Sequence, residues 1–483
     1  MSLQEENGTR PSMVWPIIVA AFMALCIFSW LAFAGARGRL SQDSEFYTAE
    51  RSREMLLLGP WGVHDNFQLS GVKPPLQYWL SAFTLARFHN PGFALRIWTL
   101  LYSLLATVTL GWLAAIIDRR RPWLIALSVG LLLTCPHFLR MAYSAMLDAG
   151  LIFFTTLLIA AAHLARSRPG WWAVATVACG VGALQKTPLI LIVWILIILL
   201  RLRNAEERQT LQTKWLLWTF AAAVIAVAAW PLIQMIAFHL SLAEVLRYRE
   251  PLIIAQRRAG APYLDAPYRL STFWPCGGLA LAGAAFLPFI KRNKPRPGAT
   301  ELCLLCLALV VLCVLSNTRQ VTYLGPILPS LCLILAMSLY WLLDQKGRIY
   351  RALGLITIGL ALAGLPIIQI WVERRISAHW RNSVRRDIPD HEAIAQALAA
   401  RQAAGKRLVV IEADNNMLPE EFYLFYGGIN SHLANLTLVE LRQTPAEPMV
   451  GISTAHDFAL VQKQFPNPRV NLARHDLVCW EVD

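Results

Sequence analysis

Long apolar runs separated by short polar segments occupy the first 372 residues of the chain. Residues 14–34 and 93–117 contain one charged residue between them, Arg96, and both exceed the roughly 18 apolar residues that indicate a membrane span. Nine further runs lie at about 122–139, 146–165, 171–184, 188–200, 215–239, 270–290, 301–316, 322–343 and 350–372. The pattern predicts a mainly α-helical, polytopic membrane bundle of about eleven spans.

The distribution of Lys and Arg between alternate loops predicts which side of the membrane each loop faces. The alternate short loops on one side carry only Arg140, Lys186 and Arg319. The loops on the other side are basic, at 119–121, 166–168, 201–214, 291–296 and 346–351, and are expected in the cytoplasm. A single long helix over 171–200 would move two basic loops outside, so we expect a turn at 185–188 between two short spans.

Three segments then face the exterior: residues 35–92, residues 240–269 and everything after about 373. The last segment is polar, which divides the chain into a transmembrane domain over 1–372 and a soluble domain over 373–483. The soluble domain is predicted to be a small α/β domain. Its expected elements are a helix over 390–403 and β-rich pieces at Leu408–Glu412, Phe458–Gln462 and Leu477–Val482.

Composition supports a membrane protein, because 56% of the residues are hydrophobic and only 15% are charged, against about 25% in soluble domains. The net charge of +14 fits the Lys and Arg anchors of membrane loops. No basic stripe with interleaved aromatic residues is present, so nucleic acid is not expected as a partner. The first apolar run could be a signal peptide ending at Ala34, but its 21 residues favour an uncleaved span.

The first external segment is unusually charged for a position at the membrane surface, where ionisable groups are costly and usually functional. Asp43 precedes a predicted helix over Glu45–Leu58, so it could cap that helix or act as a general base on a hydroxyl. Glu50 lies seven residues further on, about 10 Å along the helix axis, which is too far for the two carboxylates to share a proton. A single carboxylate base is therefore the more natural chemistry.

Cations from several external loops could form an anion site, although each one alone would be an ordinary interfacial residue. Lys73 is followed by two prolines, and it could reach lipid headgroups or hold a phosphate. Lys186, Arg319, Arg257 and Arg258 come from three other loops, and Asp148 starts a span on the same side. Convergence of these groups would suit a lipid phosphate. The sequence has no P-loop and no large cytoplasmic domain for a nucleotide sugar.

These residues resemble the first external loop of multi-span, lipid-sugar-dependent glycosyltransferases, which reads D-E-x-x-Y-x-x-x-x-x-E-M…K-P-P-L-x-x-W. The group in question is the protein O-mannosyltransferase-like superfamily, including bacterial lipid A aminoarabinose transferases. The matching positions are Asp43, Glu45, Tyr47, Glu54, Met55, Lys73, Pro74, Pro75, Leu76 and Trp79. Softer similarity continues at Ser144–Asp148, Gly182–Lys186 and Tyr323–Pro329.

The resemblance implies a C-type glycosyltransferase-like bundle and an inverting transfer from a polyprenyl-phosphate sugar to an acceptor on the periplasmic face of a bacterial inner membrane. Asp43 would be the base and Asp148 a second acidic residue of the site. The donor phosphate would lie on Lys73, Lys186 and the arginines Arg257, Arg258 and Arg319. The residues expected to contact the acceptor or support the site are Glu45, Tyr47, Glu50, Arg53, Glu54 and Tyr323.

The chain departs from the family pattern at Ser44, where a Glu is usual, and at Val72, where aminoarabinose transferases carry a Glu implicated in metal binding. A divalent metal is therefore an open question. The expected acceptor is a glycolipid such as lipid A, or an envelope glycan. A membrane transporter or a flippase of lipid-linked sugars is the alternative function, and an envelope assembly factor that binds through the C-terminal domain is a third.

Overall fold

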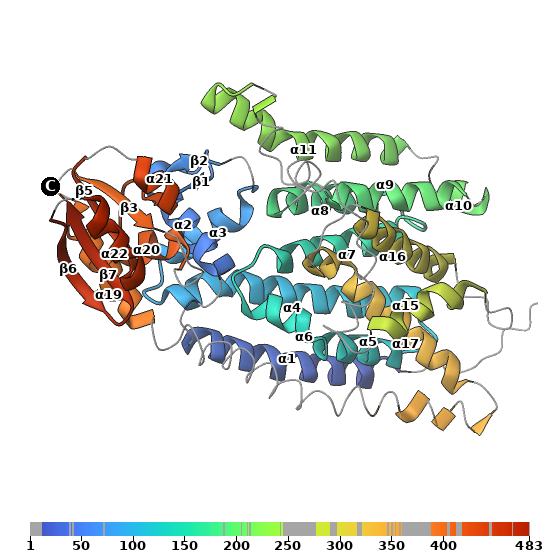
Figure 1. Cartoon of the computed structure of the whole chain (residues 1–483). Helices are drawn as coiled ribbons and strands as arrows, with labels where there is room; N and C mark the ends of the chain where they lie inside the picture. The colour runs from blue at the N-terminus through green and yellow to red at the C-terminus, as the bar shows by residue number, and fades with distance from the viewer. Residues whose placement is uncertain are drawn as a thin grey trace, which may run out of the picture. The chain divides into compact units, whose positions relative to one another are not determined.

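The structure is a computed structural model (Figure 1). It describes residues 12–37, 40, 43–70, 73–186, 189–203, 205–209, 211, 214–241, 243–244, 277–289, 297–315, 321–344, 347–348, 351–352, 354–356, 359, 388–402, 406–411, 418–443, 447–465 and 467–482. The chain forms two compact units. Unit 1 contains Met1–Ala36, Val72–Leu76 and Arg96–Ile370, and unit 2 contains Arg37–Gly71, Gln77–Leu95 and Trp371–Asp483.

Unit 1 is a bundle of helices that are apolar except for the short α10. They are α1 (Val14–Arg37), α4 (Pro91–Ile117), α5 (Trp123–Leu133), α6 (Pro136–Tyr143), α7 (Asp148–Leu164), α8 (Trp171–Gln185), α9 (Leu189–Leu202), α10 (Ala205–Gln209), α11 (Lys214–Phe238), α15 (Gly277–Phe286), η1 (Leu287–Phe289), α16 (Pro297–Leu315), η2 (Val321–Ile327) and α17 (Leu328–Leu343). Helix α8 packs against both α7 and α11. The α7–α8 approach is close, because a Cβ on Gly150 would lie 2.5 Å from the Gln185 side chain.

Of the described helices, four are long and apolar enough to cross a membrane, or five if the bent pair α5–α6 counts as one span. Five further apolar helices are shorter than that, so the predicted count of eleven spans is not reproduced as full-length helices. The expected turn between 171–184 and 188–200 is confirmed, since α8 ends at Gln185 and α9 begins at Leu189. Most of the predicted run 350–372 lies outside the described residues.

The predicted single run over 122–139 is wrong in detail, because the chain bends by 70° between α5 and α6. Cys135 has an extended backbone (φ −80°, ψ 108°) and Pro136 follows it. A proline lacks an N–H and disfavours helical backbone in the preceding residue, which ends α5 here.

Unit 2 joins two stretches that are far apart in the sequence. The first comprises α2 (Asp43–Leu58), the hairpin β1 (His64–Asp65) and β2 (Gln68–Leu69), and α3 (Leu76–Leu85). The second, which we call the tail domain, contains α19 (Ile388–Ala399), β3 (Arg407–Ile411), α20 (Glu420–Gly427), β4 (Ala434–Leu436), α21 (Leu438–Gln443), β5 (Met449–Thr454), α22 (Ala455–Gln464), β6 (Arg469–Arg474) and β7 (Leu477–Val482). Helix α2 packs on α20, as Figure 1 shows.

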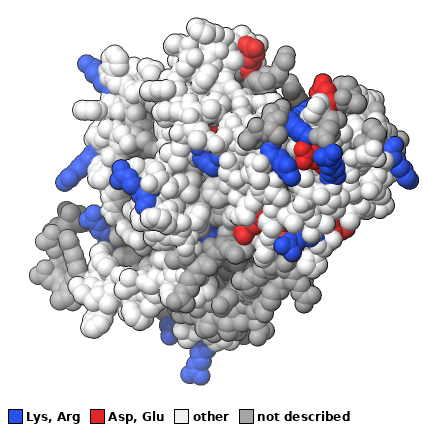
Figure 2. Space-filling model, turned by 90° about the vertical axis from the view of Figure 1, so that its left-hand side faces the viewer, with Lys and Arg blue, Asp and Glu red and all other residues white. Residues whose placement is uncertain are grey.

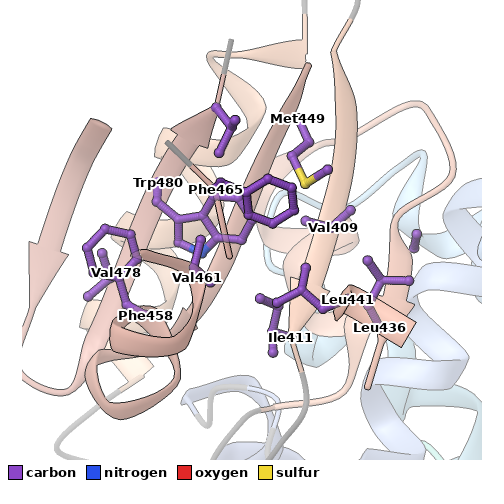
Figure 3. Packing of buried hydrophobic residues seen from close by; sticks show 12 residues of the cluster. Val409, Ile411, Leu436, Leu441, Met449, Phe458, Val461, Phe465, Val478 and Trp480 are labelled. Carbon is purple, nitrogen blue, oxygen red and sulfur yellow. The ribbon is translucent and has the colours of Figure 1, made fainter. Parts of the chain in front are cut away.

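The tail domain is built on a five-stranded sheet of order β4-β3-β5-β7-β6, in which β3 is parallel to β4 and β5 while β7 is antiparallel to β5 and β6. Alternate residues of the strands, such as Val409 and Ile411, face a core with Phe458 and Val461 of α22 (Figure 3). Helix α19 also packs on the sheet and contributes no residue to this core. The predicted fold class, a helical membrane bundle with a small α/β part at the C terminus, is therefore confirmed.

The predictions within the tail domain have mixed outcomes. The helix over 390–403 and the strands at Leu408–Glu412 and Leu477–Val482 are confirmed as α19, β3 and β7. The predicted strand at Phe458–Gln462 is wrong, because these residues belong to helix α22. Thr454 caps that helix by accepting a hydrogen bond from the Asp457 N–H, and this residue is also the last one of strand β5.

Candidate active site

Two predicted site residues of unit 1 meet in a buried ion pair. Asp148 is the first residue of α7 and Lys186 directly follows α8. The Lys186 Nζ lies 2.7 Å from the Asp148 Oδ1, and both side chains are less than a tenth exposed. Next to this pair, the Gln185 amide donates to the Leu147 carbonyl over 3.2 Å. The positive charge of Lys186 is therefore matched by Asp148, and an anion that binds Lys186 would share it with this carboxylate.

The structure places the other predicted cation and tyrosine sites only in part. Lys73 is half-buried and belongs to the short Val72–Leu76 segment of unit 1. Tyr323 lies in η2, and its side chain is outside the described part of the chain, as are Arg257, Arg258 and Arg319 altogether. Convergence of these arginines on one anion site thus stays a prediction.

The predicted helix over Glu45–Leu58 is confirmed, and it begins at Asp43. The Asp43 side chain is outside the described set. Three carboxyl groups of α2, those of Glu45, Glu50 and Glu54, are fully buried. Glu50 binds Arg53 through two hydrogen bonds of 2.7 and 2.8 Å, which offsets part of the rise in the pKa of Glu50 that burial causes. Glu50 and Arg53 are three residues apart, so this ion pair lies within α2.

The carboxyl group of Glu54 has a different environment from that of Glu50. Burial raises the pKa of its carboxyl to about 8, and the nearby Glu50 and Asp65 act in the same direction. Its Oε1 accepts a hydrogen bond of 2.7 Å from the Phe67 N–H, while its Oε2 has no hydrogen-bond partner among the described residues. A pKa of about 8 favours the neutral form of this carboxyl at neutral pH, and the hydrogen bond from Phe67 ties α2 to the hairpin.

A second link between α2 and the hairpin depends on residues that the sequence analysis did not single out. The Arg51 guanidinium binds Asp65 at 2.6 and 3.2 Å and donates to the Tyr78 hydroxyl at 3.1 Å. It also lies over the ring of Tyr47, 5.4 Å from the centroid. Tyr47 thus supports a buried arginine. The only local signal for this arrangement is Asn66 after Asp65, because asparagine tolerates the positive φ of a hairpin turn.

The tail domain completes this cluster. Arg53 donates to the Asn430 Oδ1 over 2.8 Å and also to the Ile429 carbonyl. Phe46 packs edge-to-face on Phe422, with ring centroids 5.0 Å apart. Burial raises the pKa of Glu421 on α20 to about 9, with Glu420 and Asp65 acting in the same direction. No local pattern in the sequence indicates these contacts, which join residues more than 360 positions apart.

Unit 2 also contains an apolar pocket of about 600 Å³ at the end of α2. Its lining includes Met55, Leu56, Trp61, Trp79 and Phe83. The Trp79 indole donates to the Pro60 carbonyl over 2.7 Å, which fixes the turn after α2 against α3. The pocket offers hydrocarbon contacts and no side chain for acid–base chemistry.

Unit 1 contains a second buried charge network, which the sequence analysis treated as ordinary loop cations. Glu301 on α16 binds Arg166 at 2.6 Å and Arg201 at 2.9 Å, and Glu207 binds Arg166 at 2.8 Å. The Arg201 side chain is fully buried. About 22 Å of helix separates Asp148 at the start of α7 from His163 near this network. The network therefore links α9, α10 and α16 away from the Asp148–Lys186 pair.

Within the described ranges, no group of three or more His, Cys, Asp or Glu side chains is arranged to hold a metal ion. The described residues therefore form no metal site, and the reaction proposed below is written with this chain's own residues. Figure 2 shows one face of the molecule, on which the described Lys and Arg side chains lie singly or beside acidic ones, with uncharged surface between them.

Comparisons with known proteins agree with the resemblance in the first loop. A family model for dolichyl-phosphate-mannose-protein mannosyltransferase matches residues 41–244. No curated protein matches the chain.

Solved structures share the fold over most of the chain. The crystal structure of ArnT from Cupriavidus metallidurans bound to undecaprenyl phosphate covers 98% of this chain, and the match covers 98% of that protein, with 15% identity and a TM-score of 0.70. The Archaeoglobus fulgidus oligosaccharyltransferase covers 90% of this chain over 65% of its own length, with 12% identity and a TM-score of 0.58. A complex of the same archaeal enzyme with an inhibitory peptide and a dolichol-phosphate matches at 10% identity, covers 88% of this chain and 64% of its own, and has a TM-score of 0.58.

The predicted resemblance to polyprenyl-phosphate-dependent membrane glycosyltransferases is thereby confirmed. The chain is a multi-pass membrane protein with the fold of ArnT.

Proposed function

We propose that this protein is a membrane glycosyltransferase that moves a sugar from a polyprenyl-phosphate donor to an acceptor hydroxyl on the periplasmic face of a bacterial inner membrane. The observation that carries the proposal is the family-model match over 41–244, which includes α2, Lys73, Asp148 and Lys186. The ArnT fold over nearly the whole chain supports it, since that protein binds undecaprenyl phosphate.

The proposed reaction is a single displacement at the anomeric carbon. The carboxylate of Asp43 takes the proton from the acceptor hydroxyl as its oxygen attacks. The new C–O bond forms as the bond between the anomeric carbon and the phosphate oxygen breaks, and the configuration is inverted. The polyprenyl phosphate leaves with its negative charge, which Lys73 and the external arginines Arg257, Arg258 and Arg319 would stabilise.

The buried pair of Asp148 and Lys186 supports a position for the donor phosphate at Lys186. Lys186 sits 2.7 Å from Asp148, and a phosphate approaching Lys186 would draw it partly from that carboxylate. Asp148 then holds the Lys186 side chain in place before the donor arrives. Lys186 is a phosphate-binding residue in this scheme and Asp148 is its acidic partner.

The α2 residues and Tyr323 of η2 divide between supporting and acceptor roles. Glu50, Arg53 and Glu54 bind one another, the hairpin or the tail domain, so they support the position of the helix. Glu45, Tyr47 and Tyr323 keep the proposed role at the acceptor, with Tyr47 also lying under Arg51. The acceptor we propose is a glycolipid such as lipid A, or an envelope glycan. The bundle over 1–372 would provide the site, and 373–483 would form the periplasmic domain.

The test uses purified full-length protein in nanodiscs, supplied with a lipid extract containing polyprenyl-phosphate sugars and an envelope glycolipid extract as acceptor. Mass spectrometry measures the polyprenyl phosphate released and the sugar gained by the acceptor. Asp43→Asn is expected to abolish transfer while the binding of undecaprenyl phosphate is retained. Asp118→Asn, on a loop expected at the opposite face, is the matched control and should transfer normally.

Lys73→Ala in the same assay should weaken donor binding or slow departure of the phosphate, because one cation is lost from the leaving group. Wild-type turnover by Asp43→Asn would remove Asp43 from the mechanism. A wild-type protein that moves the lipid-linked sugar across the bilayer without acceptor-dependent release of polyprenyl phosphate would instead be a transporter or flippase.

A further inference from the structure

The turn of the β1–β2 hairpin forms hydrogen bonds with the backbone of the tail domain. The Asn66 side-chain amide donates to the Leu433 carbonyl over 2.6 Å, and the Leu433 N–H donates to the Asn66 Oδ1 over 2.8 Å. The Asn66 carbonyl lies 3.0 Å from the His432 Nδ1. Asn66 is 8% exposed and Leu433 is fully buried, so water competes little for these bonds.

The backbone of the hairpin explains why an asparagine occupies this position. Asn66 and Phe67 both have positive φ, 54° and 63°, as a two-residue turn of this hand requires. Asparagine adopts this backbone more readily than other residues with a side chain. It also supplies one donor and one acceptor, which match the N–H and carbonyl of Leu433.

The hairpin also forms hydrogen bonds with α2. The Phe67 N–H donates to Glu54, and Asp65 holds Arg51. Arg53 reaches the tail domain directly, at Ile429 and Asn430. The last two turns of α2 are therefore fixed to residues 429–433 by a continuous set of hydrogen bonds.

The tail domain also contacts the beginning of α2. Phe46 is 1% exposed and packs on Phe422 at 5.0 Å and on Tyr426 at 6.5 Å. Phe46 is three residues after Asp43, less than one helical turn. Contacts at both ends of a helix restrict its rotation about its axis and its translation along it.

We propose that Asn66 is a positioning residue: through the backbone of Leu433 it uses the tail domain to hold α2, and with it Asp43, in the geometry that the reaction needs. The inference rests on the proposed function, because it concerns the placement of the proposed base. It gives the tail domain a task in catalysis without any contact with substrate. Donor phosphate binding belongs to Lys73 and Lys186 and is independent of this contact.

The first test is Asn66→Gly in the full-length protein in nanodiscs. Glycine accepts the positive φ without strain, so the variant removes the two side-chain bonds and leaves the turn. The matched control is Asn467→Gly, at another positive-φ asparagine, on an exposed turn before β6. The readouts are the rate of polyprenyl phosphate release per folded protein, the affinity for undecaprenyl phosphate, and hydrogen exchange of residues 43–58.

We expect Asn66→Gly to lower the transfer rate by roughly 10- to 100-fold, because a displacement of about 1 Å in a reacting group has an effect of this size. Undecaprenyl phosphate affinity should be unchanged, exchange over 43–58 should accelerate, and strands β3 and β5 should keep their protection. Asn467→Gly should match the wild type in all three. Asn430→Ala, which removes one bond to Arg53 from the other side of the contact, should shift the rate and the exchange in the same direction.

A transfer rate in Asn66→Gly equal to that of the wild type would overturn the inference, whatever the exchange of α2. So would loss of protection throughout the tail domain with an unchanged rate per folded molecule, which indicates a purely structural role. Failure of the proposed function is distinguishable, since the wild type itself would then show no acceptor-dependent release while α2 exchange still responds to Asn66→Gly.

Discussion

Glu54→Gln tests whether a buried neutral carboxyl ties α2 to the hairpin. The carboxyl has an ordinary pKa of 4.5 in the unfolded chain and one raised to about 8 in the folded protein, chiefly by burial. Between these two pH values the folded state binds the proton and the unfolded state does not. The stability that Glu54 contributes therefore falls as the pH rises from about 4.5 to 8, and this contribution is constant outside that window.

The size of the effect follows from the shift. A difference of about 3.5 pKa units corresponds to a loss on the order of 5 kcal/mol between pH 4 and pH 9 from this one group. Glutamine has nearly the same shape and no charge, and its Oε1 can still accept the Phe67 N–H. The variant should therefore lack this part of the alkaline sensitivity.

The assay is thermal unfolding of the full-length protein in one detergent at pH 5, 7 and 9, followed by tryptophan fluorescence, since Trp61 and Trp79 lie beside the end of α2. The unfolding midpoints of wild type and Glu54→Gln should coincide at pH 5, and the variant should be higher at pH 9. Glu447→Gln is the control, because Glu447 is 54% exposed and its pair with Arg407 spans 3.9 Å.

Glu421 titrates in the same cluster, with its pKa raised to about 9, so the double variant Glu54→Gln/Glu421→Gln should have the flattest pH profile. Identical profiles for wild type and Glu54→Gln across this range would refute the reasoning, since the carboxyl would then not be buried in its neutral form.

Two further variants probe the packing of each unit. Glu301→Gln leaves the fully buried Arg201 without its main counter-charge, which should destabilise unit 1 by about 3–5 kcal/mol. An unfolding midpoint no lower than that of Glu447→Gln, whose exposed pair should contribute less than about 1 kcal/mol, would contradict this. Gly451→Ala places a Cβ 2.2 Å from the Trp480 ring and should force β5 from β7 at a cost of about 1–3 kcal/mol. Unchanged near-ultraviolet circular dichroism of the tryptophans together with an unchanged unfolding midpoint would show that the sheet accommodates the methyl group.

Local signals in the sequence were sufficient for several elements. The charged run after Asp43 predicted α2, and the distribution of Lys and Arg between alternate loops predicted the break between α8 and α9. The strand at Phe458–Gln462 failed because a short apolar run fits a strand and a buried helix equally well. Thr454 followed three residues later by Asp457 was the available signal for a helix start there.

Long-range contacts were beyond any such pattern. Arg201 and Glu301 are a hundred residues apart, and each looks like an ordinary residue near the end of an apolar run. Asn66 and Leu433 are separated by 367 positions, and one partner contributes only its backbone, which has no residue signature. The sequence therefore predicts charged residues on α2 and the loops as a candidate site, which stays a prediction, whereas the support that holds α2 was not predictable.

The hydrogen bonds between Asn66 and Leu433 also constrain the path of the chain through the bilayer. Two groups bonded to each other must lie on one side of a membrane, so the chain crosses an even number of times between the hairpin and α20. Any topology with an odd number of crossings there is incompatible with the fold. The order of translation also matters for these bonds, because α2 and the hairpin leave the ribosome long before Leu433 has been synthesised. A nascent or truncated chain that lacks residues 429–433 cannot form the hydrogen bonds that Arg53 and Asn66 make with the tail domain.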